Sequence, residues 1–269
     1  MTDEPSFARA QRFERRIRRD VAARMERFEW GTAYFDPNHP LVWDLNFLEV
    51  EAVDAQVTAD DLVAVADRIQ GAVGLGHRRI VVDDDTVAES LAPRFRELDW
   101  MVNKFLFMEL KRAAERPPRV RRAREIDRDN HRDVYVRTTS EAPYGGVPDV
   151  VRQLADHTDG IAARTGVRYF GAIDDDGTLA SICVMFSDGE IAQIEDVATL
   201  KDYRGRGLAT ELLGLAISEA KEAAHDLIFL VADEEDWPKD LYGKLGFEPM
   251  GLSYDFVLPG DVVYGNENH

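Results

Sequence analysis

The segment Tyr203-Arg-Gly-Arg-Gly-Leu-Ala-Thr210 carries the most informative pattern in this chain. It stands between a strand-like segment, residues 191–199, and an amphipathic helix expected over about 207–224. Two glycines this close together allow the backbone to curl so that successive N–H groups point inward. The start of a helix adds free N–H groups and the positive end of the helix dipole. The segment therefore predicts an anion-binding turn.

Three phosphate-binding patterns can be compared with this turn. A Walker P-loop requires a Lys that is missing here, and a dinucleotide fingerprint requires a third glycine where Thr210 stands. The pattern Gln/Arg-x-x-Gly-x-Gly/Ala is satisfied by Arg204, Gly207 and Ala209. The structural alternative is a glycine-rich helix start that binds no ligand.

Two more segments accompany the turn, Ile194-Glu-Asp-Val-Ala-Thr199 upstream and Asp240-Leu-Tyr-Gly-Lys-Leu-Gly-Phe247 downstream. In order and spacing, the three segments resemble the fourth strand, the pyrophosphate loop and the Leu-Tyr-x-Lys-Leu-Gly-Phe segment of the GNAT superfamily of N-acetyltransferases. The resemblance covers residues 119–258. It implies a GNAT fold, acetyl-CoA as the acyl donor and no metal ion.

The resemblance also implies roles for individual residues. Backbone groups of the expected fourth strand would pair with the pantetheine arm of the cofactor and hold the acyl carbonyl; these belong to Val197, Ala198 and Thr199. The pyrophosphate would lie in the turn, formed by Arg204, Gly205, Arg206, Gly207, Leu208, Ala209 and Thr210. Tyr242 would be the general acid that protonates the departing thiolate of coenzyme A. Glu235, where many relatives carry Asn, is assigned to the cofactor side.

A general base is expected to be a carboxylate, because the incoming amine must lose a proton. Glu195 and Asp196 are neighbours on a strand, and alternation would place only one of them in the cleft. We favour Glu195, with Glu234 and Glu235 as rivals. The alternative is that Glu195 is an ion-pair residue and that no dedicated base exists.

The order of predicted elements divides the chain into two regions. The Pro117-Pro118 pair and the arginine-rich stretch 116–132 suggest a boundary near 112–120. Residues 1–115 repeat the helix, strand, helix, strand order of the later part, so we interpret them as a degenerate GNAT-like domain. The segment Val57-Thr-Ala-Asp-Asp61 stands where its turn should be and has no glycine. Residues 119–258 form the expected catalytic GNAT domain and 259–269 a polar tail.

The overall prediction is an α/β fold with a mixed sheet. The first region is expected to begin with a helix whose apolar face carries Phe13, Ile17, Val21, Met25 and Phe28. Its other elements are strands at 31–35, 41–50, 79–82 and 100–110 and helices at 60–73 and 86–97. The second region is expected to have strands at 119–124, 169–173, 179–186, 191–199, 227–231 and 254–258. Its helices are two between 127 and 165, then 207–224 and 237–245.

Composition excludes several classes of protein. The chain has 269 residues, is 45% hydrophobic and carries a net charge of −18, which is unfavourable for nucleic-acid binding. It has no apolar run of membrane-spanning length. The single Cys183 and six scattered histidines give no disulfide or metal-ligand pattern, and the Asp triplets 83–85 and 174–176 are typical of turns. We expect a cytoplasmic protein without membrane partners. The sequence leaves open whether the protein forms a homo-oligomer.

Two functions from different classes follow. The first is an acyl-CoA-dependent N-acyltransferase that transfers acetyl from acetyl-CoA to a primary amine by direct attack; the acidic composition would suit a cationic amine. The alternative is a non-catalytic acyl-CoA-binding protein with a regulatory or scaffolding role. Release of free coenzyme A in the presence of an amine would separate them.

Overall fold

The computed structural model describes residues 4–51, 57–163 and 165–260 of the chain. The first part contains α1 (Ser6–Val21), β1 (Arg24–Phe28), β2 (Gly31–Phe35), the 3-10 helix η1 (Trp43–Leu45), β3 (Phe47–Val50), α2 (Ala59–Ala72), β4 (Arg78–Val82), α3 (Asp85–Glu97) and β5 (Met101–Leu110). The second part contains β6 (Ala123–Ile126), α4 (Arg128–Ser140), α5 (Pro148–Ala162), β7 (Gly166–Ile173), β8 (Leu179–Ser187), β9 (Ile191–Thr199), η2 (Lys201–Tyr203), α6 (Leu208–Glu222), β10 (Leu227–Asp233), α7 (Pro238–Leu245) and β11 (Phe247–Leu258).

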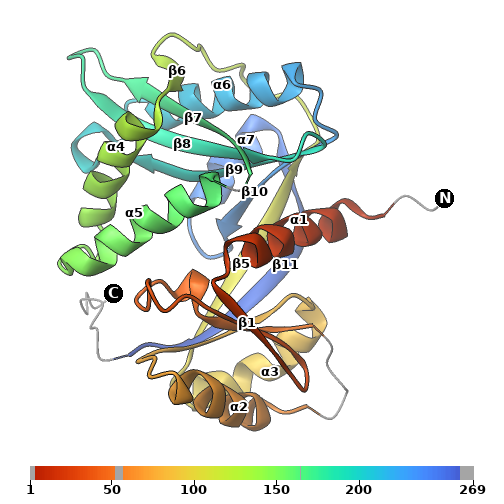
Figure 1. The fold of residues 1–269 in the computed structure, drawn as a ribbon. Coiled ribbons are helices and arrows are strands. Elements are labelled where there is room, and N and C mark those ends of the chain that lie inside the picture. Colours follow the sequence, from red (N-terminus) through yellow and green to blue (C-terminus); the bar gives the residue numbers. More distant parts are fainter. Residues whose placement is uncertain (1–3, 52–56, 164, 261–269) are drawn as a thin grey trace.

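All strands of the described residues belong to one mixed sheet, which confirms the predicted fold class. Its order is β1-β2-β3-β4-β11-β5-β10-β9-β8-β7-β6. The β3–β4 and β9–β10 pairs are parallel and the other neighbours antiparallel. Two lobes are visible, with β1–β4, α2 and α3 in one and β6–β10 and α4–α7 in the other (Figure 1).

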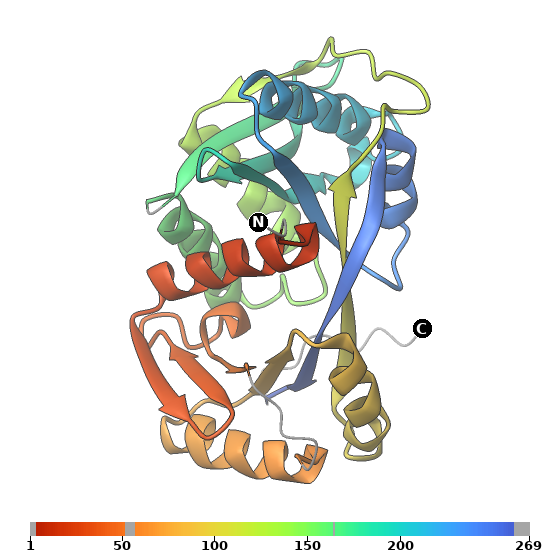
Figure 2. The same ribbon diagram turned by 90° about the vertical axis from the view of Figure 1, so that its right-hand side faces the viewer.

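The two central strands connect the lobes. β5 lies between β10 and β11, and β11 lies between β5 and β4, so each lobe contains a strand from the other part of the chain. Figure 2 shows β5 and β11 side by side as they run from one lobe to the other. The units α2-β4-α3-β5 and α6-β10-α7-β11 thus repeat the same element order and exchange their last strands. The division at 1–115 and 119–258 remains a prediction, and it assigns β5 and β11 to different regions.

Gly246 shows how closely the two parts approach each other. Its φ of +105° ends α7 in the left-handed conformation. A Cβ here would lie 2.2 Å from the backbone oxygen of Arg112, just after β5. The N–H groups of Lys111 and Arg112 donate to the Gly246 carbonyl at 3.1 and 3.2 Å. The Leu-Gly-Phe motif therefore has a structural role: it joins α7 and β11 to the end of β5.

Three large groups of buried apolar side chains stabilise the fold. One fills the space between α6, α7 and strands β7–β10, and a second lies between α2, α3 and the strands of the first lobe, including Tyr254 and Phe256 of β11. The third lies under α1 and brings Phe13 against Phe229, which stacks on Phe107 of β5. Because α1 packs on α5, β5, β10 and β11, it spans both lobes.

Several predicted elements differ from the observed ones. The strand predicted at 254–258 begins at Phe247, because the preceding residues pair with β5. Met25 and Phe28 are in β1, not in the first helix, because the backbone becomes extended at Ala22 and pairs with β2. Only Phe47–Val50 of the predicted 41–50 strand is extended; the Asn46 side chain donates to the carbonyls of His39 and Val42 and stabilises a turn. The strand predicted at 119–124 begins at Ala123.

The late start of β6 has a local cause. The backbone N–H groups of Arg121 and Arg122 both donate to the Glu211 carboxylate at 3.0 Å, so they are not available to a strand partner. The side chain of Arg122 binds the same carboxylate. Arg132 similarly pairs with Asp156 and Asp159. These arginines of the basic stretch pair within the chain, as the acidic composition predicts.

In the described part of the first lobe, the starts of α2 and α3 are closed by side-chain caps, unlike the glycine turn. At the N-terminus of α2, the Thr58 hydroxyl accepts from the N–H of Asp61 and the Asp61 carboxylate accepts from the N–H of Thr58. This capping box occupies the groups that an anion would need. The absence of glycines at 57–61 therefore corresponds to a closed helix start.

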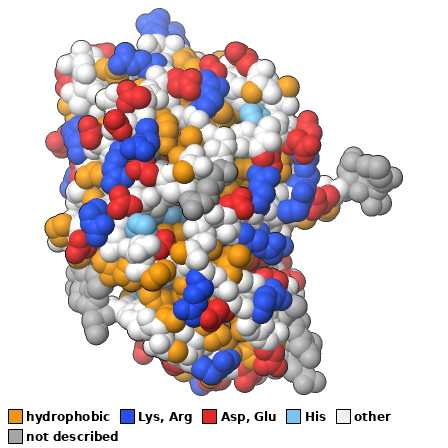
Figure 3. Space-filling view, in the orientation of Figure 1, with side chains coloured by type: hydrophobic (Ala, Val, Ile, Leu, Met, Phe, Trp, Pro, Cys, Tyr) orange, Lys and Arg blue, Asp and Glu red, His pale blue; other side chains and the backbone are white. Residues whose placement is uncertain are grey.

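The face of the molecule shown in Figure 3 is mixed in charge. Lys and Arg side chains alternate with Asp and Glu across the face in Figure 3, with apolar side chains between them. Among the described residues, no helix combines the length and the apolar character needed to cross a bilayer. The predicted tail lies almost wholly outside the described residues, since residues 261–269 are not among them.

The exchange of β5 and β11 predicts that the second region does not fold by itself. A fragment of residues 119–258 lacks β5, so β10 and β11 would each expose an unpaired edge in the middle of the sheet. We expect no cooperative thermal transition for this fragment in near-UV circular dichroism, and recovery of the transition when residues 1–115 are co-expressed. A sharp transition for the fragment alone would show that β5 is dispensable.

Candidate active site

The predicted anion-binding turn is formed by two glycines in the left-handed conformation. Gly205 has φ +76° and Gly207 φ +78°, values that L side chains rarely adopt. Gly207 is the N-cap of α6 and provides no side-chain cap. The first-turn N–H groups of Leu208, Ala209 and Thr210 therefore remain available to a ligand. A substituent on Gly205 would meet no atom within 4 Å, so the turn opens toward free space.

Arginine side chains stabilise the turn through hydrogen bonds and ion pairs with neighbouring residues. Arg204 Nε donates to the Thr199 carbonyl at 3.1 Å, and Arg206 Nη2 donates to the Asp202 carbonyl at 2.8 Å. Arg206 also forms an ion pair with Asp174. Arg122 Nη2 donates to the Arg206 carbonyl at 2.9 Å and at the same time neutralises Glu211 in the first turn of α6. The helix start is thereby kept free of an unpaired negative charge.

A groove of about 740 Å³ extends from this turn to α7. Ten of the predicted site residues line it: Val197, Ala198, Thr199, Arg204, Gly205, Gly207, Leu208, Ala209, Thr210 and Tyr242. Three are not brought into its lining, and one of them, Glu195, lines a separate cavity instead. The Arg206 side chain is held by Asp174 and Asp202, and Glu235 is exposed on the loop before α7. The groove also has residues that the motifs did not single out, among them Tyr135 and Thr138 of α4.

The groove follows an open edge of β9. β9 and β10 are paired from Ile191 and Leu227 to Gln193 and Phe229, where the pairing ends. Beyond this point the edge of β9 that faces β10 borders the groove, whereas its other edge remains paired with β8. Backbone donors and acceptors of Val197–Thr199 can therefore pair with an extended ligand.

A bulge in β9 changes which side chains face inward. Asp196 has φ +54°, and the register with β8 shifts between Ile182 and Val184. Glu195 and Asp196 both line a second cavity of about 370 Å³. The bulge interrupts the expected alternation, so both residues line this cavity, and only Asp196 also lines the groove.

The second cavity and the groove meet at Asp196 and Tyr135, which line both. The cavity is bounded by α1, α5, β5 and the diverging ends of β9 and β10. Its wall includes Glu14 and Arg18 of α1, residues that sequence reasoning missed. The available signal was weak: a Glu and an Arg four residues apart beside the apolar stripe of a helix, which usually indicates a surface pair.

The two carboxylates of β9 are electrostatically unusual. Burial, followed by the nearby charges of Glu14 and Asp196, raises the pKa of Glu195 well above its ordinary value. Burial and the charge of Asp44 raise the pKa of Asp196 to about 6. Gln193 Nε2 donates to Glu195 at 2.6 Å and to Glu14 at 2.8 Å, so one amide holds two carboxylates together. Both β9 carboxylates therefore hold a proton more tightly than an ordinary carboxylate does.

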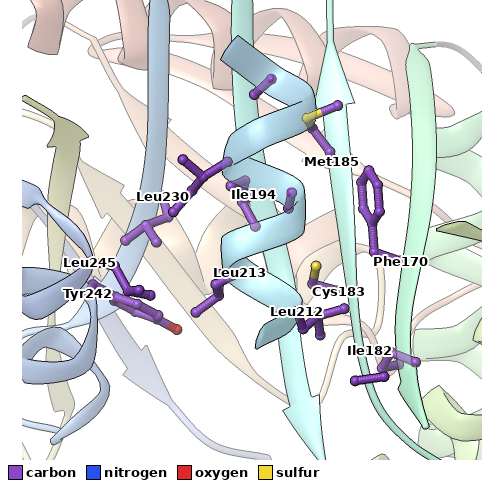
Figure 4. Packing of buried hydrophobic residues seen from close by; sticks show 14 of the residues in the cluster. Phe170, Ile182, Cys183, Met185, Ile194, Leu212, Leu213, Leu230, Tyr242 and Leu245 are labelled. Carbon is purple, nitrogen blue, oxygen red and sulfur yellow. The ribbon is translucent and has the colours of Figure 1, made fainter. Parts of the chain in front are cut away.

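Tyr242 presents a proton donor to the groove. Its ring is 8% exposed and packs beside Leu213 and Leu245 (Figure 4). Its hydroxyl has no hydrogen-bond partner among the residues described. Burial, with the charge of Glu195, raises the Tyr242 pKa, so the hydroxyl keeps its proton at neutral pH. A ligand atom in the groove can accept this proton.

The geometry offers no metal centre within the described ranges, where no group of three or more His, Cys, Asp and Glu side chains is arranged to hold an ion. The groove instead combines an anion-binding helix start, an open strand edge and a proton donor. This arrangement suits a long ligand with phosphates at one end and a reactive group at the other.

Comparisons with known proteins agree with this geometry. The acetyltransferase (GNAT) family model matches residues 123–247. A functionally unknown conserved protein from Staphylococcus epidermidis has a similar structure, with TM-score 0.69 and 16% identity over 89% of this chain and 94% of that one. A GCN5-related N-acetyltransferase from Sphaerobacter thermophilus gives TM-score 0.63 and 13% identity over 97% and 95%.

A third similar structure is a tandem GNAT protein from the clavulanic acid biosynthesis pathway, with TM-score 0.52 and 17% identity over 86% of this chain and 80% of that one. No curated protein matches the chain in sequence. At these identities the solved structures establish a shared fold. The tandem protein agrees with the repeated unit described above.

The raised pKa of Asp196 predicts a pH-dependent gain in stability for Asp196→Asn. In the folded chain Asp196 binds its proton more tightly than in the unfolded chain, so its charge destabilises the fold above pH 6. We expect Asp196→Asn to raise the free energy of unfolding by about 1–3 kcal/mol at pH 8, with the gain decreasing as pH falls from 6 to 4. Urea unfolding at several pH values measures this.

Asp188→Asn is the matched control. Burial alone would raise the Asp188 pKa, but the N–H groups of Ile191 and Glu190 and the charge of Arg16 together lower it. This variant should therefore lose stability at pH 8. A gain for Asp196→Asn that does not change with pH would contradict the electrostatic account and point to relief of the positive φ.

Proposed function

We propose that this chain, whose residues 123–247 form a domain of the GNAT acetyltransferase family, is an acyl-CoA-dependent N-acyltransferase that transfers acetyl from acetyl-CoA to a primary amine. The observation that carries the proposal is the groove itself. It joins a phosphate-binding helix start, an open strand edge and the Tyr242 hydroxyl in one continuous site.

The donor would lie along the whole groove. The N–H groups from Gly205 to Thr210 would hold the pyrophosphate, with the dipole of α6 adding a favourable interaction. Backbone groups of Val197–Thr199 would pair with the pantetheine arm. The thioester would then lie near Asp196 and Tyr135, where the groove meets the second cavity.

The reaction would be a direct acyl transfer. The neutral amine attacks the thioester carbonyl, a C–N bond forms, and the C–S bond breaks as the tetrahedral intermediate collapses. The departing thiolate takes a proton from the Tyr242 hydroxyl, whose raised pKa keeps it protonated until then. The proton lost by the amine passes to a carboxylate of β9. Glu195 is the proposed base, and Asp196 lines the same cavity.

The cytoplasmic location and a possible homo-oligomeric state are part of this proposal only as expectations from the sequence. The same holds for the absence of nucleic-acid partners. A non-catalytic acyl-CoA-binding protein would use the same groove. The presence of a buried Tyr242 with an unpartnered hydroxyl supports the enzyme, because binding alone does not require a proton donor there.

Gly207→Glu is expected to abolish acetyl-CoA binding. The glutamate would place a side chain and a negative charge at the helix start where the pyrophosphate lies. We expect the affinity measured by calorimetry to fall at least 100-fold, roughly 2.7 kcal/mol. Gly189→Glu is the matched control, since Gly189 also has a positive φ and open space around it but lies in the turn between β8 and β9.

Equal affinities of the wild type and Gly207→Glu for acetyl-CoA would rule out the turn as the phosphate site. If wild-type protein binds acetyl-CoA but no primary amine causes release of free thiol, the binding function is retained and the transferase is rejected.

Tyr242→Phe is expected to slow turnover with little change in acetyl-CoA affinity. It removes the proposed proton donor and leaves the ring packed in the core. We expect kcat to fall by about 10²-fold, the lower range for general acid catalysis. Tyr254→Phe controls for the loss of a buried tyrosine hydroxyl, because Tyr254 donates to Glu89 far from the groove. Full turnover in Tyr242→Phe would remove the general-acid role.

A further inference from the structure

We infer that the cavity of about 370 Å³ behind β9 is the acceptor site and that it selects an aliphatic compound with two cationic amino groups, a diamine or polyamine. The inference rests on the proposed function for the transfer step. It adds the acceptor class and assigns part of the acceptor site to the first lobe.

The cavity wall has more acidic side chains than basic ones. Five carboxylates line it, against two guanidinium groups, those of Arg18 and Arg79. Both guanidinium groups also donate hydrogen bonds to carboxylates that do not line the cavity. Arg18 Nη1 donates to Glu49 at 2.9 Å, and Arg79 Nε donates to Asp255 at 2.7 Å. His157 adds little positive charge, because burial lowers its pKa.

Glu195 and Asp196 have no Lys or Arg partner in the described part of the chain. The contacts of Glu195 are the Gln193 amide and the charges of Glu14 and Asp196. The nearest donor to Asp196 is the Thr158 hydroxyl, at 3.5 Å. Buried carboxylates without a cation are costly, so a cationic ligand would be bound with a large electrostatic gain.

The negative charge is divided between two positions. Asp196 lies where the cavity meets the groove, which is where the reacting nitrogen must be. Glu195, the proposed base, lies beside Asp196, whereas Glu14 of α1 forms a second position, which the amide of Gln193 links to Glu195. Glu14 is only partly neutralised, because Arg18 divides its donors between Glu14 and Glu49. One acidic position at the junction with the groove and another at Glu14 of α1 fit a ligand with two ammonium groups.

Buried hydrogen-bond acceptors also line the cavity. Gln193 is 4% exposed and Ser253 3% exposed, and both belong to the wall. The Gln193 carbonyl oxygen and the Ser253 hydroxyl can each accept a hydrogen bond from a ligand in the cavity. An ammonium group donates three hydrogen bonds and accepts none, so acceptor oxygens are the partners that it requires.

The remaining wall suits a methylene chain. Phe105, Phe107, Phe186 and Val231 also line the cavity. An aliphatic spacer would bury apolar surface against these side chains, whereas a sugar ring would place hydroxyl groups against them without partners. Aromatic faces also attract ammonium groups. An aliphatic spacer is therefore favoured over a polyhydroxylated one.

Both lobes contribute to this cavity. Glu14 and Arg18 come from α1, Asp44 from η1 and Arg79 from β4, whereas β9 and α5 provide the wall on the other side. The first lobe, where side chains cap the starts of α2 and α3, thus acquires a function. It completes the acceptor site of the second lobe.

The test is calorimetric titration of the full chain, saturated with free coenzyme A, with 1,4-diaminobutane and with 1-aminobutane. We expect the diamine to bind at least about tenfold more tightly than the monoamine. Glu14→Gln should lower diamine affinity about tenfold and monoamine affinity less than twofold, because it removes charge only from the second position. Glu14→Asp, which keeps the charge, should retain most of the preference.

Glu222→Gln is the matched control, since it removes the same charge from the exposed face of α6 and should leave both affinities unchanged. Equal wild-type affinities for the two amines would overturn the inference, and this comparison requires no variant. A preference for the diamine that persists in a folded Glu14→Gln variant would also overturn the inference. If coenzyme A does not bind, the titration is run on the protein alone: a diamine preference then supports this acceptor site while the proposed donor site fails.

Discussion

The pairing of β5 with both β10 and β11 is the constraint on which the rest of the structure depends. These three strands occupy the centre of the sheet, and β5 comes from a part of the chain that precedes the whole GNAT-like segment. Its insertion positions α7 through Gly246, whose carbonyl accepts from the backbone just after β5. Because β11 then continues into the first lobe beside β4, the two lobes share one sheet and their relative position is fixed by backbone hydrogen bonds.

The position of the candidate active site is determined by the place where two strands of this sheet stop pairing. β9 and β10 are held together at one end and diverge beyond Gln193, and the open edge of β9 borders the groove. The bulge at Asp196 then turns two adjacent carboxylates toward the second cavity. Such a backbone conformation and such unpaired carboxylates reduce stability, and both occur at the junction of the groove and the cavity. Stability and function therefore make opposing demands at this point.

Sequence patterns predicted most elements and much of the groove. The helix at 208–222 and the strand at 191–199 follow from apolar periodicity, and the conformations of Gly205 and Gly207 follow from the steric freedom of glycine. The family resemblance is confirmed by the match over 123–247. The roles of Tyr242 and Glu195 stay predictions. Glu235, which was expected on the cofactor side, lies outside the groove lining, and so do Arg206 and Glu195.

The sequence by itself determined what depends on neighbouring residues: periodicity, helix caps, the glycine turn and the order of the repeated units. Only the tertiary structure decided what depends on residues far apart in the chain. Three features belong to this class: the exchange of β5 and β11, the joint orientation of Glu195 and Asp196, and the hydrogen bond between Gln193 and Glu14. The physical reason is that strand order and register are set by contacts between distant segments, and a single bulge reverses the side-chain alternation that local sequence predicts.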